Sequence, residues 1–181
     1  MKIGQIRQSL SGFYDIYSDG QTYRTRARGN FRKRKITPLV GDQVEFDSTT
    51  LQEGYLLKVL DRQTQLVRPP VANVNLAVVV TATTKQEFST NLLDRQLVAL
   101  EVAGIQGVVY FAKTDLLDDE TYAQREQLAQ RYRQIGYPVI IDRTAFSDAS
   151  LTAIKKELAG HVAVVMGQTG AGKSTLLNHL Q

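Results

Sequence analysis

The sequence predicts an N-terminal all-β barrel of the OB type followed by an α/β domain built on a parallel sheet. Up to about residue 61, short segments rich in β-branched and aromatic residues alternate with turn residues. From residue 74 onward, apolar segments of strand length alternate with segments of helical length and periodicity. The chain has 181 residues, 43% of them hydrophobic, so two small cores are possible.

The first domain is expected over residues 1–68. Strands are predicted at residues 12–18, 21–27, 40–47 and 54–61, with turn residues between them. Strands at this spacing favour a small closed antiparallel barrel of the OB type, although an SH3-like barrel would leave nearly the same pattern.

The second domain is expected over residues 69–181, because Pro69 and Pro70 interrupt regular structure where the pattern changes. Strands are predicted at residues 74–82, 107–112, 137–142 and 161–166. Helices are predicted at residues 92–102, 119–135, about 151–158 and 174–180. Strands and helices in this order give a parallel sheet with right-handed crossovers.

The positive charge of the chain is concentrated toward its N-terminus. Residues 1–70 contain 12 Lys and Arg against 7 Asp and Glu, whereas residues 71–181 contain 10 against 11. The centre of this excess is the run YRTRARGNFRKRK at residues 23–35. Such a run attracts polyanions, and Tyr23 and Phe31 interleave it with aromatic rings, which favours contact with RNA. A solvated hairpin without a ligand is the alternative. The candidate RNA-binding residues are Arg24, Arg26, Arg28, Arg32, Lys33, Arg34 and Lys35.

The chain contains no cysteine, which excludes disulfides and thiolate zinc sites within these residues. The N-terminus lacks the apolar core of a signal peptide. The longest strongly apolar run, at residues 76–80, is too short to span a bilayer. We therefore expect a cytoplasmic protein without a membrane partner.

The segment GQTGAGKST at residues 167–175 contains the phosphate-loop pattern G-x-x-x-x-G-K-[ST], between an apolar strand and a helical segment. Its glycines let backbone amides wrap a phosphate, and the helix that follows directs its positive end toward the anion. Lys173 is expected to reach the β- and γ-phosphates and Ser174 to ligate Mg²⁺, which gives both residues a catalytic role. The candidate phosphate-binding residues are Gly167, Gln168, Thr169, Gly170, Ala171, Gly172, Lys173, Ser174 and Thr175.

A second motif follows the predicted strand at residues 107–112. The segment Ala112, Lys113, Thr114 and Asp115 matches the guanine-reading pattern N-K-x-D except for its Asn. Ligands bind at the carboxyl ends of strands in parallel sheets. We expect Asp115 to read the base and the aliphatic stem of Lys113 to lie along the purine. The alternative for Asp115 is a helix N-cap.

Taken together, these segments resemble the circularly permuted GTPases that depend on the small ribosomal subunit, whose base-reading motifs precede the phosphate loop. The resemblance covers essentially the whole chain: the barrel, the connector LDRQTQLVRPPVANVN, the segments LLDRQLVALEVAG and AKTDLL, and the phosphate loop. It implies a P-loop GTPase that uses GTP and Mg²⁺, releases GDP, acts in maturation of the small subunit and contacts its rRNA through the barrel. We expect a monomer.

The resemblance also implies a second base motif, an S-A dipeptide whose backbone N–H contacts the guanine carbonyl oxygen. Thr144 and Ala145 are the closest match, while Ser147 and Ser150 are alternative candidates as caps of the next helix. Ala112 stands where the family has Asn. The loss of one neutral hydrogen bond, about 1 kcal/mol, is expected to weaken nucleotide binding several-fold.

Members of this family continue beyond the phosphate-loop helix with a switch threonine, a D-x-P-G segment and a zinc-binding domain. None of these lies within the 181 residues, so we expect zinc only in that further domain and a longer parent protein. These residues alone are expected to hydrolyse GTP poorly, because only Lys173, Ser174 and the loop amides neutralise charge at the transferring phosphoryl group. Two other functions stay open, an ATP-using P-loop protein and an RNA-binding module with a vestigial nucleotide site.

Overall fold

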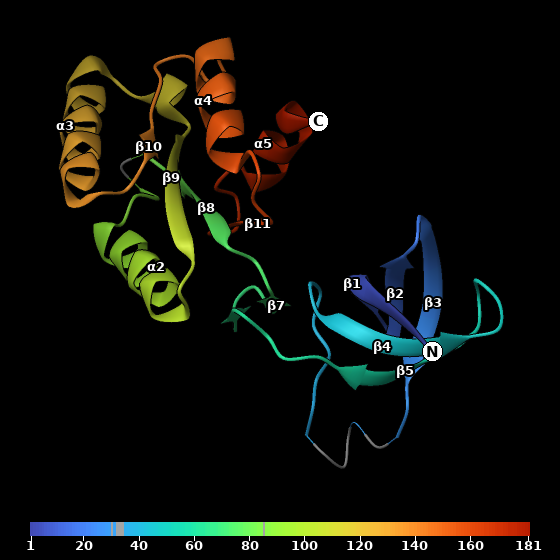
Figure 1. Cartoon of the computed structure of the whole chain (residues 1–181). Coiled ribbons are helices and arrows are strands. Elements are labelled where there is room, and N and C mark those ends of the chain that lie inside the picture. Colours follow the sequence, from blue (N-terminus) through green and yellow to red (C-terminus); the bar gives the residue numbers. More distant parts are fainter. Residues whose placement is uncertain (30, 32–34, 85) are drawn as a thin grey trace. The chain divides into compact units, whose positions relative to one another are not determined.

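The computed structural model describes residues 1–29, 31, 35–84 and 86–181. The chain divides into two compact units, Met1–Asn73 and Val74–Gln181. The first unit is a barrel of strands, and the second is a sheet flanked by helices (Figure 1). This is the order of folds that the sequence predicts.

The first unit is a closed barrel with the strand order β1-β2-β3-β5-β4. Neighbouring strands pair antiparallel except β3 and β5, which run parallel, and β1 pairs with β4 to close the barrel. A five-stranded barrel connected in this way has the OB arrangement and not the SH3-like alternative. The strands are β1 (Lys2–Leu10), β2 (Phe13–Ser18), β3 (Gln21–Ala27), β4 (Gln43–Ser48) and β5 (Gly54–Val59).

Strand β1 is a barrel strand that the sequence analysis does not predict. Only Gly4 and Ile6 are buried along it, and its register shifts between Ile6 and Gln8. The strand therefore lacks the apolar alternation by which strands are recognised. Its place is set instead by backbone pairing with β2 on one side and β4 on the other.

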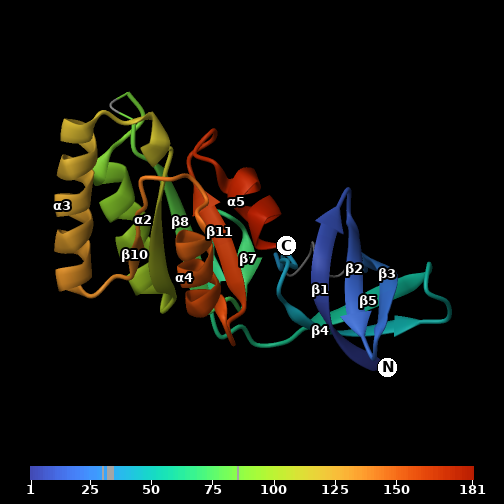
Figure 2. The same cartoon turned by 90° about the horizontal axis from the view of Figure 1, so that it is seen from above.

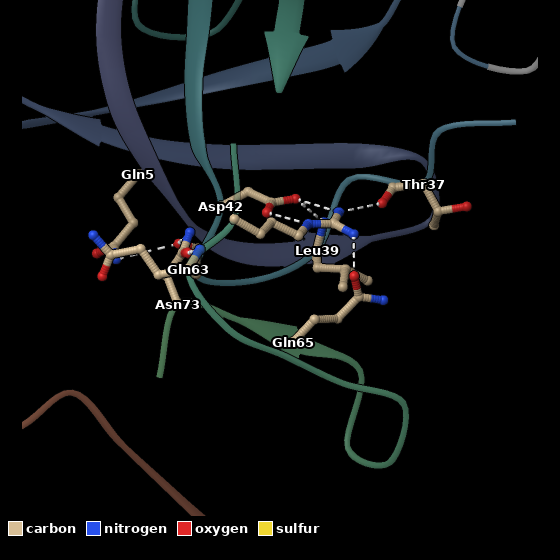
Figure 3. A network of polar contacts seen from close by, with 9 residues as sticks. Gln5, Thr37, Leu39, Asp42, Gln63, Gln65 and Asn73 are labelled. Atoms are coloured by element: carbon tan, nitrogen blue, oxygen red, sulfur yellow. Dashed lines mark hydrogen bonds and ion pairs between the residues drawn. The ribbon is translucent and has the colours of Figure 1, made fainter. Parts of the chain in front are cut away.

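A polar network holds the segment that follows β5 against the barrel (Figure 3). Arg62 donates from Nε and Nη2 to the two carboxylate oxygens of Asp42, at 2.7 and 2.8 Å, and from Nη2 to the backbone oxygen of Thr37 at 2.8 Å. Asp42 is fully buried and also accepts from the backbone N–H of Leu39 at 2.7 Å. The hydrogen bond to Asp42 raises the pKa of Arg62. The pair is thus a buried anchor for the connector.

The same connector contains a small two-stranded sheet of β6 (Gln65–Leu66) and β7 (Val71–Ala72). The side-chain amide of Asn73 donates to the backbone oxygen of Gly41 at 3.0 Å, which ties the end of this segment to the barrel. The first unit therefore extends to Asn73, whereas the sequence places the boundary at residue 68.

The second unit is built on a parallel sheet of the order β10-β9-β8-β11. Helices α2 and α3 cover one face of this sheet, and α4 and α5 cover the other (Figure 2). Its strands are β8 (Leu76–Ala82), β9 (Gln106–Ala112), β10 (Val139–Ile140) and β11 (Ala163–Gly167). Its helices are α2 (Thr90–Ala103), the 3-10 turn η1 (Thr114–Leu116), α3 (Asp119–Ile135), α4 (Asp148–Leu158) and α5 (Lys173–Leu180).

Strand β8 lies between β9 and β11 and is buried over nearly its whole length. Alternate residues of β8 and β9 form one core with Ile154 of α4 and Leu176 of α5. On α2 the buried residues are Leu93, Leu97 and Leu100, as their helical spacing predicts. A strand covered on both faces reads as a continuous apolar run, which is why residues 76–80 are so hydrophobic.

Candidate nucleotide-binding site

The two sequence motifs leave the sheet at the same edge. Val80 of β8 pairs with Tyr110 of β9 on one side and with Gly167 of β11 on the other. Ala82 pairs with Ala112, the first residue of the segment AKTD. Because the three strands are parallel, the segments that follow β9 and β11 emerge at their common carboxyl edge, where ligands bind in such sheets.

The phosphate loop passes close to the centre of the sheet. Gly167 has φ 141°, and a Cβ atom there would lie 2.1 Å from the backbone oxygen of Val80, so only glycine fits. Gly172, at φ 103°, begins α5 without any side-chain cap. The first N–H groups of α5 are consequently left for an anion. A Cβ atom on Gly172 would lie 3.7 Å from Cβ of Ala112, so this turn lies beside the start of the AKTD segment.

Lys173 is folded over its own loop. Its ammonium donates to the backbone oxygens of Gly167 at 2.9 Å and Gln168 at 2.6 Å. Ser174 is exposed, whereas the Ala171 side chain is 1% exposed and belongs to the core. Ala171 therefore faces a ligand only through its backbone. The remaining side chains of the loop, Gln168, Thr169 and Thr175, are exposed, as is Gly170.

The AKTD segment turns sharply after β9. Lys113 has φ 61°, and Asp115 is exposed in η1. The ammonium of Lys113 donates to both carboxylate oxygens of Glu87, at 2.9 and 2.8 Å, and Glu87 also accepts from the hydroxyl of Thr84. These bonds, that from Lys113 first, lower the pKa of Glu87. Sequence reasoning misses Glu87, because the loop after β8 carries no motif.

The second candidate base-reading loop is joined directly to the first. Thr114 is buried, and its hydroxyl donates to the backbone oxygen of Asp142 at 2.5 Å. The carboxylate of Asp142 accepts from the backbone N–H of Thr144 at 2.9 Å and from the hydroxyl of Ser147. The bonds from Ser147 and then Thr144 lower the pKa of Asp142. Thr144 and Ala145 thus lie in a loop that the third residue of AKTD holds in place.

Ser147 also caps α4, because its hydroxyl accepts from the backbone N–H of Ser150 at 3.1 Å. This confirms the capping role considered for it. The helix begins at Asp148, earlier than the predicted start near residue 151, since the cap precedes its first apolar residue.

A stack of three rings joins this loop to the phosphate-loop helix. The Phe146 ring lies 6.2 Å from that of Tyr110 and 4.3 Å from that of His179 in α5, at interplanar angles of 15° and 11°. Burial, as the largest cause, raises the pKa of Tyr110, and the charges of Asp142 and Asp115 raise it further. The stacked rings of Tyr110 and Phe146 thus connect β9 to the loop that contains Thr144 and Ala145.

Basic residues of the barrel lie beside two aromatic rings. The guanidinium carbons of Arg24 and Arg26 lie 5.4 and 4.4 Å from the ring centre of Phe13, and that of Arg28 lies 5.5 Å from the ring centre of Tyr55. Lys35 is exposed. The candidates Arg32, Lys33 and Arg34 lie outside the described residues.

The expected role of Tyr23 and Phe31 as aromatic partners for RNA is wrong. Both rings are only 7% exposed and pack in the barrel core, the Tyr23 ring at 5.2 Å from that of Phe46. Alternation along β3 turns Tyr23 inward and its arginine neighbours outward. The rings beside the arginines belong to the half-buried Phe13 on β2 and the exposed Tyr55 on β5, which sequence proximity could not indicate.

Two family models match the chain. The model for the RsgA N-terminal domain matches residues 3–56, and the model for the RsgA GTPase matches residues 59–181. The chain belongs to the RsgA GTPase family. Its barrel therefore corresponds to the RsgA N-terminal domain and its α/β unit to the RsgA GTPase.

Relatives within the RsgA family cover the whole chain. It is 80% identical over 181 residues to "Small ribosomal subunit biogenesis GTPase RsgA 1" of Lactiplantibacillus plantarum, with all of this chain and 61% of that protein covered. It is 62% identical to the RsgA protein of Limosilactobacillus fermentum over 99% of this chain and 61% of that protein. The chain thus spans about 61% of the length of these relatives.

Solved structures give the same fold. The crystal structure of YloQ, described as a circularly permuted GTPase, matches with a TM-score of 0.78 and 40% identity, over 98% of this chain and 63% of that one. YjeQ from Thermotoga maritima matches with a TM-score of 0.82 and 28% identity, over 99% and 65%. The fold of this RsgA family member is therefore that of a circularly permuted GTPase preceded by a barrel.

In the part of the chain that the structure describes, no helix is long and apolar enough to cross a membrane. Within the same ranges, no three His, Cys, Asp or Glu side chains come together to hold a metal ion.

Proposed function

We propose that this RsgA family member binds GTP and GDP between its phosphate loop and its AKTD segment. We also propose that the whole protein is a GTPase of small-subunit biogenesis, as the printed names of its relatives describe. The observation that supports nucleotide binding is the register of Val80 with both Tyr110 and Gly167, which brings the two motifs to one edge of the sheet. Such work would take place in the cytoplasm, and we expect a monomer.

The phosphates are assigned to the loop from Gly167 to Thr175. Its backbone N–H groups and the uncapped start of α5 would surround the anion. Lys173 would exchange its two backbone acceptors for the β- and γ-phosphates, since an ammonium bonded to neutral carbonyls gains from a doubly charged partner. Hydrogen bonds to charged groups are worth about 1.5–3 kcal/mol each.

Ser174 fits the Mg²⁺ that accompanies a nucleoside triphosphate. Its exposed hydroxyl follows Lys173 at the start of α5, and Mg²⁺ prefers hard oxygen ligands shared between protein and phosphates. Bound there, the ion would neutralise charge between the β- and γ-phosphates. Zinc is proposed only for the part of RsgA proteins that lies outside these residues.

The base is assigned to the two loops that Thr114 joins. The exposed Asp115 carboxylate would accept from the ring N–H and the amino group of guanine, while the Lys113 stem covers the purine. A backbone N–H at Thr144 or Ala145 would reach the guanine carbonyl oxygen. The Ala112 side chain is buried and apolar, so it offers the nucleotide no hydrogen bond.

Small-subunit rRNA is assigned to the barrel. Arg24 and Arg26 are exposed on β3, Arg28 is exposed directly after it, and with Lys35 they form the described part of the basic run. Neutralisation of phosphates by such residues gives salt-dependent binding. Replacing Arg24, Arg26 and Arg28 by Gln is expected to weaken binding to isolated small subunits and to flatten its dependence on salt. An unchanged slope would remove this face from the interface.

The nucleotide assignment is tested by competition. A fluorescent GDP analogue bound to the chain with Mg²⁺ is displaced by unlabelled GTP, ATP or xanthosine triphosphate. We expect GTP to compete far better than ATP. Asp115→Asn is expected to weaken GTP binding about 100-fold, since two hydrogen bonds to a charged group are disturbed. The same change is expected to improve binding of the xanthine nucleotide, which presents a carbonyl where guanine has its amino group.

Glu120→Gln is the matched control, because Glu120 is exposed, lies five positions after Asp115 in the first turn of α3, and accepts from Gln124 of the same helix. Its affinity for GTP should not change. If ATP displaces the probe as well as GTP does, Asp115 does not read a base and the ATP-using alternative holds. If the whole protein shows no affinity for GTP, the nucleotide site is vestigial. These residues alone are expected to turn over GTP slowly, and a rate equal to that of the whole protein would contradict this expectation.

A further inference from the structure

The barrel contains a cavity of about 540 Å³ between β3 and the turn that joins β4 to β5. We call it the barrel cavity, and its walls include Phe13, Arg24, Arg26, Arg28 and Tyr55. Pockets for small organic ligands commonly occupy about 300–1,000 Å³. The barrel cavity is therefore large enough for one nucleotide, and it belongs wholly to the first unit.

Thr25 and Gly54 are lining residues of the barrel cavity that are packed tightly against their neighbours, and we call them its floor. Thr25 is buried, and its hydroxyl already donates to the backbone oxygen of Tyr14 at 3.0 Å. At Gly54 a Cβ atom would lie 2.9 Å from both Cγ2 of Thr25 and the backbone oxygen of Asp47, so the strands meet there without room for a side chain. Such a floor offers an occupant van der Waals contact and few free polar groups.

The walls combine aromatic rings with guanidinium groups. Tyr55 is 54% exposed even though Arg28 lies beside it, so part of its ring is free. Arg26 lies 4.4 Å from the ring centre of Phe13. Proteins bind single-stranded nucleic acids through aromatic rings flanked by arginines, because every base has a flat face that can stack on such a ring.

The charges of the barrel cavity favour an unpaired nucleotide over a duplex. In the described part of the chain, neither Arg26 nor Arg28 pairs with a carboxylate, so both can meet a phosphate, while Arg24 is already bridged to Asp15 at 3.1 Å. Asp47 and Glu53 also line the cavity. Carboxylates repel phosphates but accept hydrogen bonds from the amino groups of a base. In a duplex the bases remain paired and mainly the phosphates are exposed, so these carboxylates favour an unpaired base.

We infer that the barrel cavity takes one unpaired nucleotide of an RNA strand, with its base stacked on Tyr55 and its phosphate held by Arg26 and Arg28. This inference rests on the proposed contact between barrel and rRNA and makes it more specific. The barrel would recognise an unpaired loop or bulge and not a regular helix.

The test uses the 181-residue chain and single-stranded RNA of about eight nucleotides, within the range that an OB fold covers. The strand carries 2-aminopurine, whose fluorescence falls when the base stacks, and a duplex of the same sequence is the comparison. We expect quenching on binding and a preference for the single strand. Tyr55→Ala is expected to weaken binding about 5- to 100-fold and to abolish quenching, while Tyr55→Phe keeps both.

Tyr17→Ala is the matched control. The Tyr17 ring also carries a guanidinium, that of Arg7 at 3.5 Å, but it does not line the barrel cavity. Its affinity and quenching should equal those of the unchanged chain. Arg28→Gln serves as a second variant should Tyr55→Ala fail to fold, and it is expected to lower the salt dependence of binding.

Equal binding of duplex and single strand, or full quenching in Tyr55→Ala, would overturn the inference while leaving a salt-dependent rRNA contact intact. Absence of binding to either RNA would overturn it together with the barrel's proposed role. Binding of the fluorescent GDP analogue, measured in the same samples, keeps the nucleotide site separate from both results.

Discussion

The hydroxyl of Thr114 donates to the backbone oxygen of Asp142, so two loops 28 residues apart in the sequence share one partly buried hydrogen bond. Thr114 is 2% exposed, and Asp142 in turn holds the backbone N–H of Thr144. The two proposed base-reading loops thereby fix each other. Position 114 is the variable position of the N-K-x-D motif, yet in this chain its side chain joins the two loops, a role that the motif does not include.

Thr114→Val should therefore weaken GDP binding, although the Thr114 side chain is not proposed to contact the nucleotide. Valine keeps the shape of the side chain but leaves the backbone oxygen of Asp142 without its donor, which costs about 1–3 kcal/mol. We expect part of this free energy to be lost as increased mobility of the two loops. We expect affinity for GDP to fall about 5- to 10-fold, measured by titration calorimetry. Thr25→Val is the control, since its buried hydroxyl also donates to a backbone oxygen, but in the barrel. An equal loss in both variants would exclude a specific role for Thr114.

Glu87→Ala should also weaken nucleotide binding, but less. Glu87 accepts from the Lys113 ammonium with both carboxylate oxygens, and this exposed ion pair restrains the lysine stem that is proposed to cover the purine. Without Glu87 the stem would be held less firmly. We expect GDP affinity to fall roughly two- to fivefold. The loss should be smaller at high salt, because salt screens surface ion pairs. Glu101→Ala, which removes a single bond from Tyr137, should change nothing. Unaltered affinity in Glu87→Ala would show that Lys113 needs no partner.

The buried pair of Arg62 and Asp42 should dominate the stability of the first unit. Asp42→Asn leaves the guanidinium without its counter-charge, and breaking such a pair typically costs about 3–5 kcal/mol. Because Arg62 is 22% exposed, we expect the low end, about 3 kcal/mol, in urea denaturation followed by tyrosine fluorescence. Asp15→Asn breaks the more exposed pair with Arg24 and should cost about 1 kcal/mol or less. Similar losses in both variants would contradict the anchor role of Arg62.

Tyr132 should make the second unit sensitive to alkali. Its hydroxyl donates to Asp94 at 2.6 Å, and burial first, then this bond, raise its pKa above the usual value near 10. Above that value the unfolded chain releases a proton that the folded chain keeps. The free energy of unfolding therefore falls as pH rises from about 10 toward the folded pKa, by up to about 1.4 kcal/mol per pH unit for this group.

Tyr132→Phe isolates this effect. The variant should lose about 1 kcal/mol near neutral pH, where the hydrogen bond is missing, but its stability should fall less steeply in alkali. Burial also raises the pKa of Tyr110, Tyr122 and Tyr137, so the two chains are compared by the difference between their curves. Parallel curves would show that Tyr132 ionises equally in both states.

Much of the α/β unit could be predicted because its signals are local. Helix α3 begins and ends where the sequence places it, since Asp118 accepts from the backbone N–H of Thr121 and Gly136 supplies the left-handed end. The phosphate loop and the AKTD segment were both found from the residue types that a strand and a turn require. Their meeting at one sheet edge follows from parallel topology alone.

What could not be predicted depends on partners distant in the sequence. Strand β1 is polar and is recognised only by its pairing with β2 and β4. Glu87 reaches Lys113 across 26 residues, and nothing near Glu87 marks it. The aromatic rings near the arginines were misassigned, because which face of β3 is buried depends on how the barrel closes.

Ala112 is held at the start of the AKTD segment through its main chain. Its carbonyl oxygen receives two bonds from the fully buried Thr83, from the backbone N–H at 3.0 Å and the hydroxyl at 2.7 Å. Both bonds are to the backbone carbonyl group, which every amino acid has. These two bonds would form with any residue at position 112, so the start of the AKTD segment is anchored by Thr83, which directly follows β8 and belongs to neither nucleotide motif.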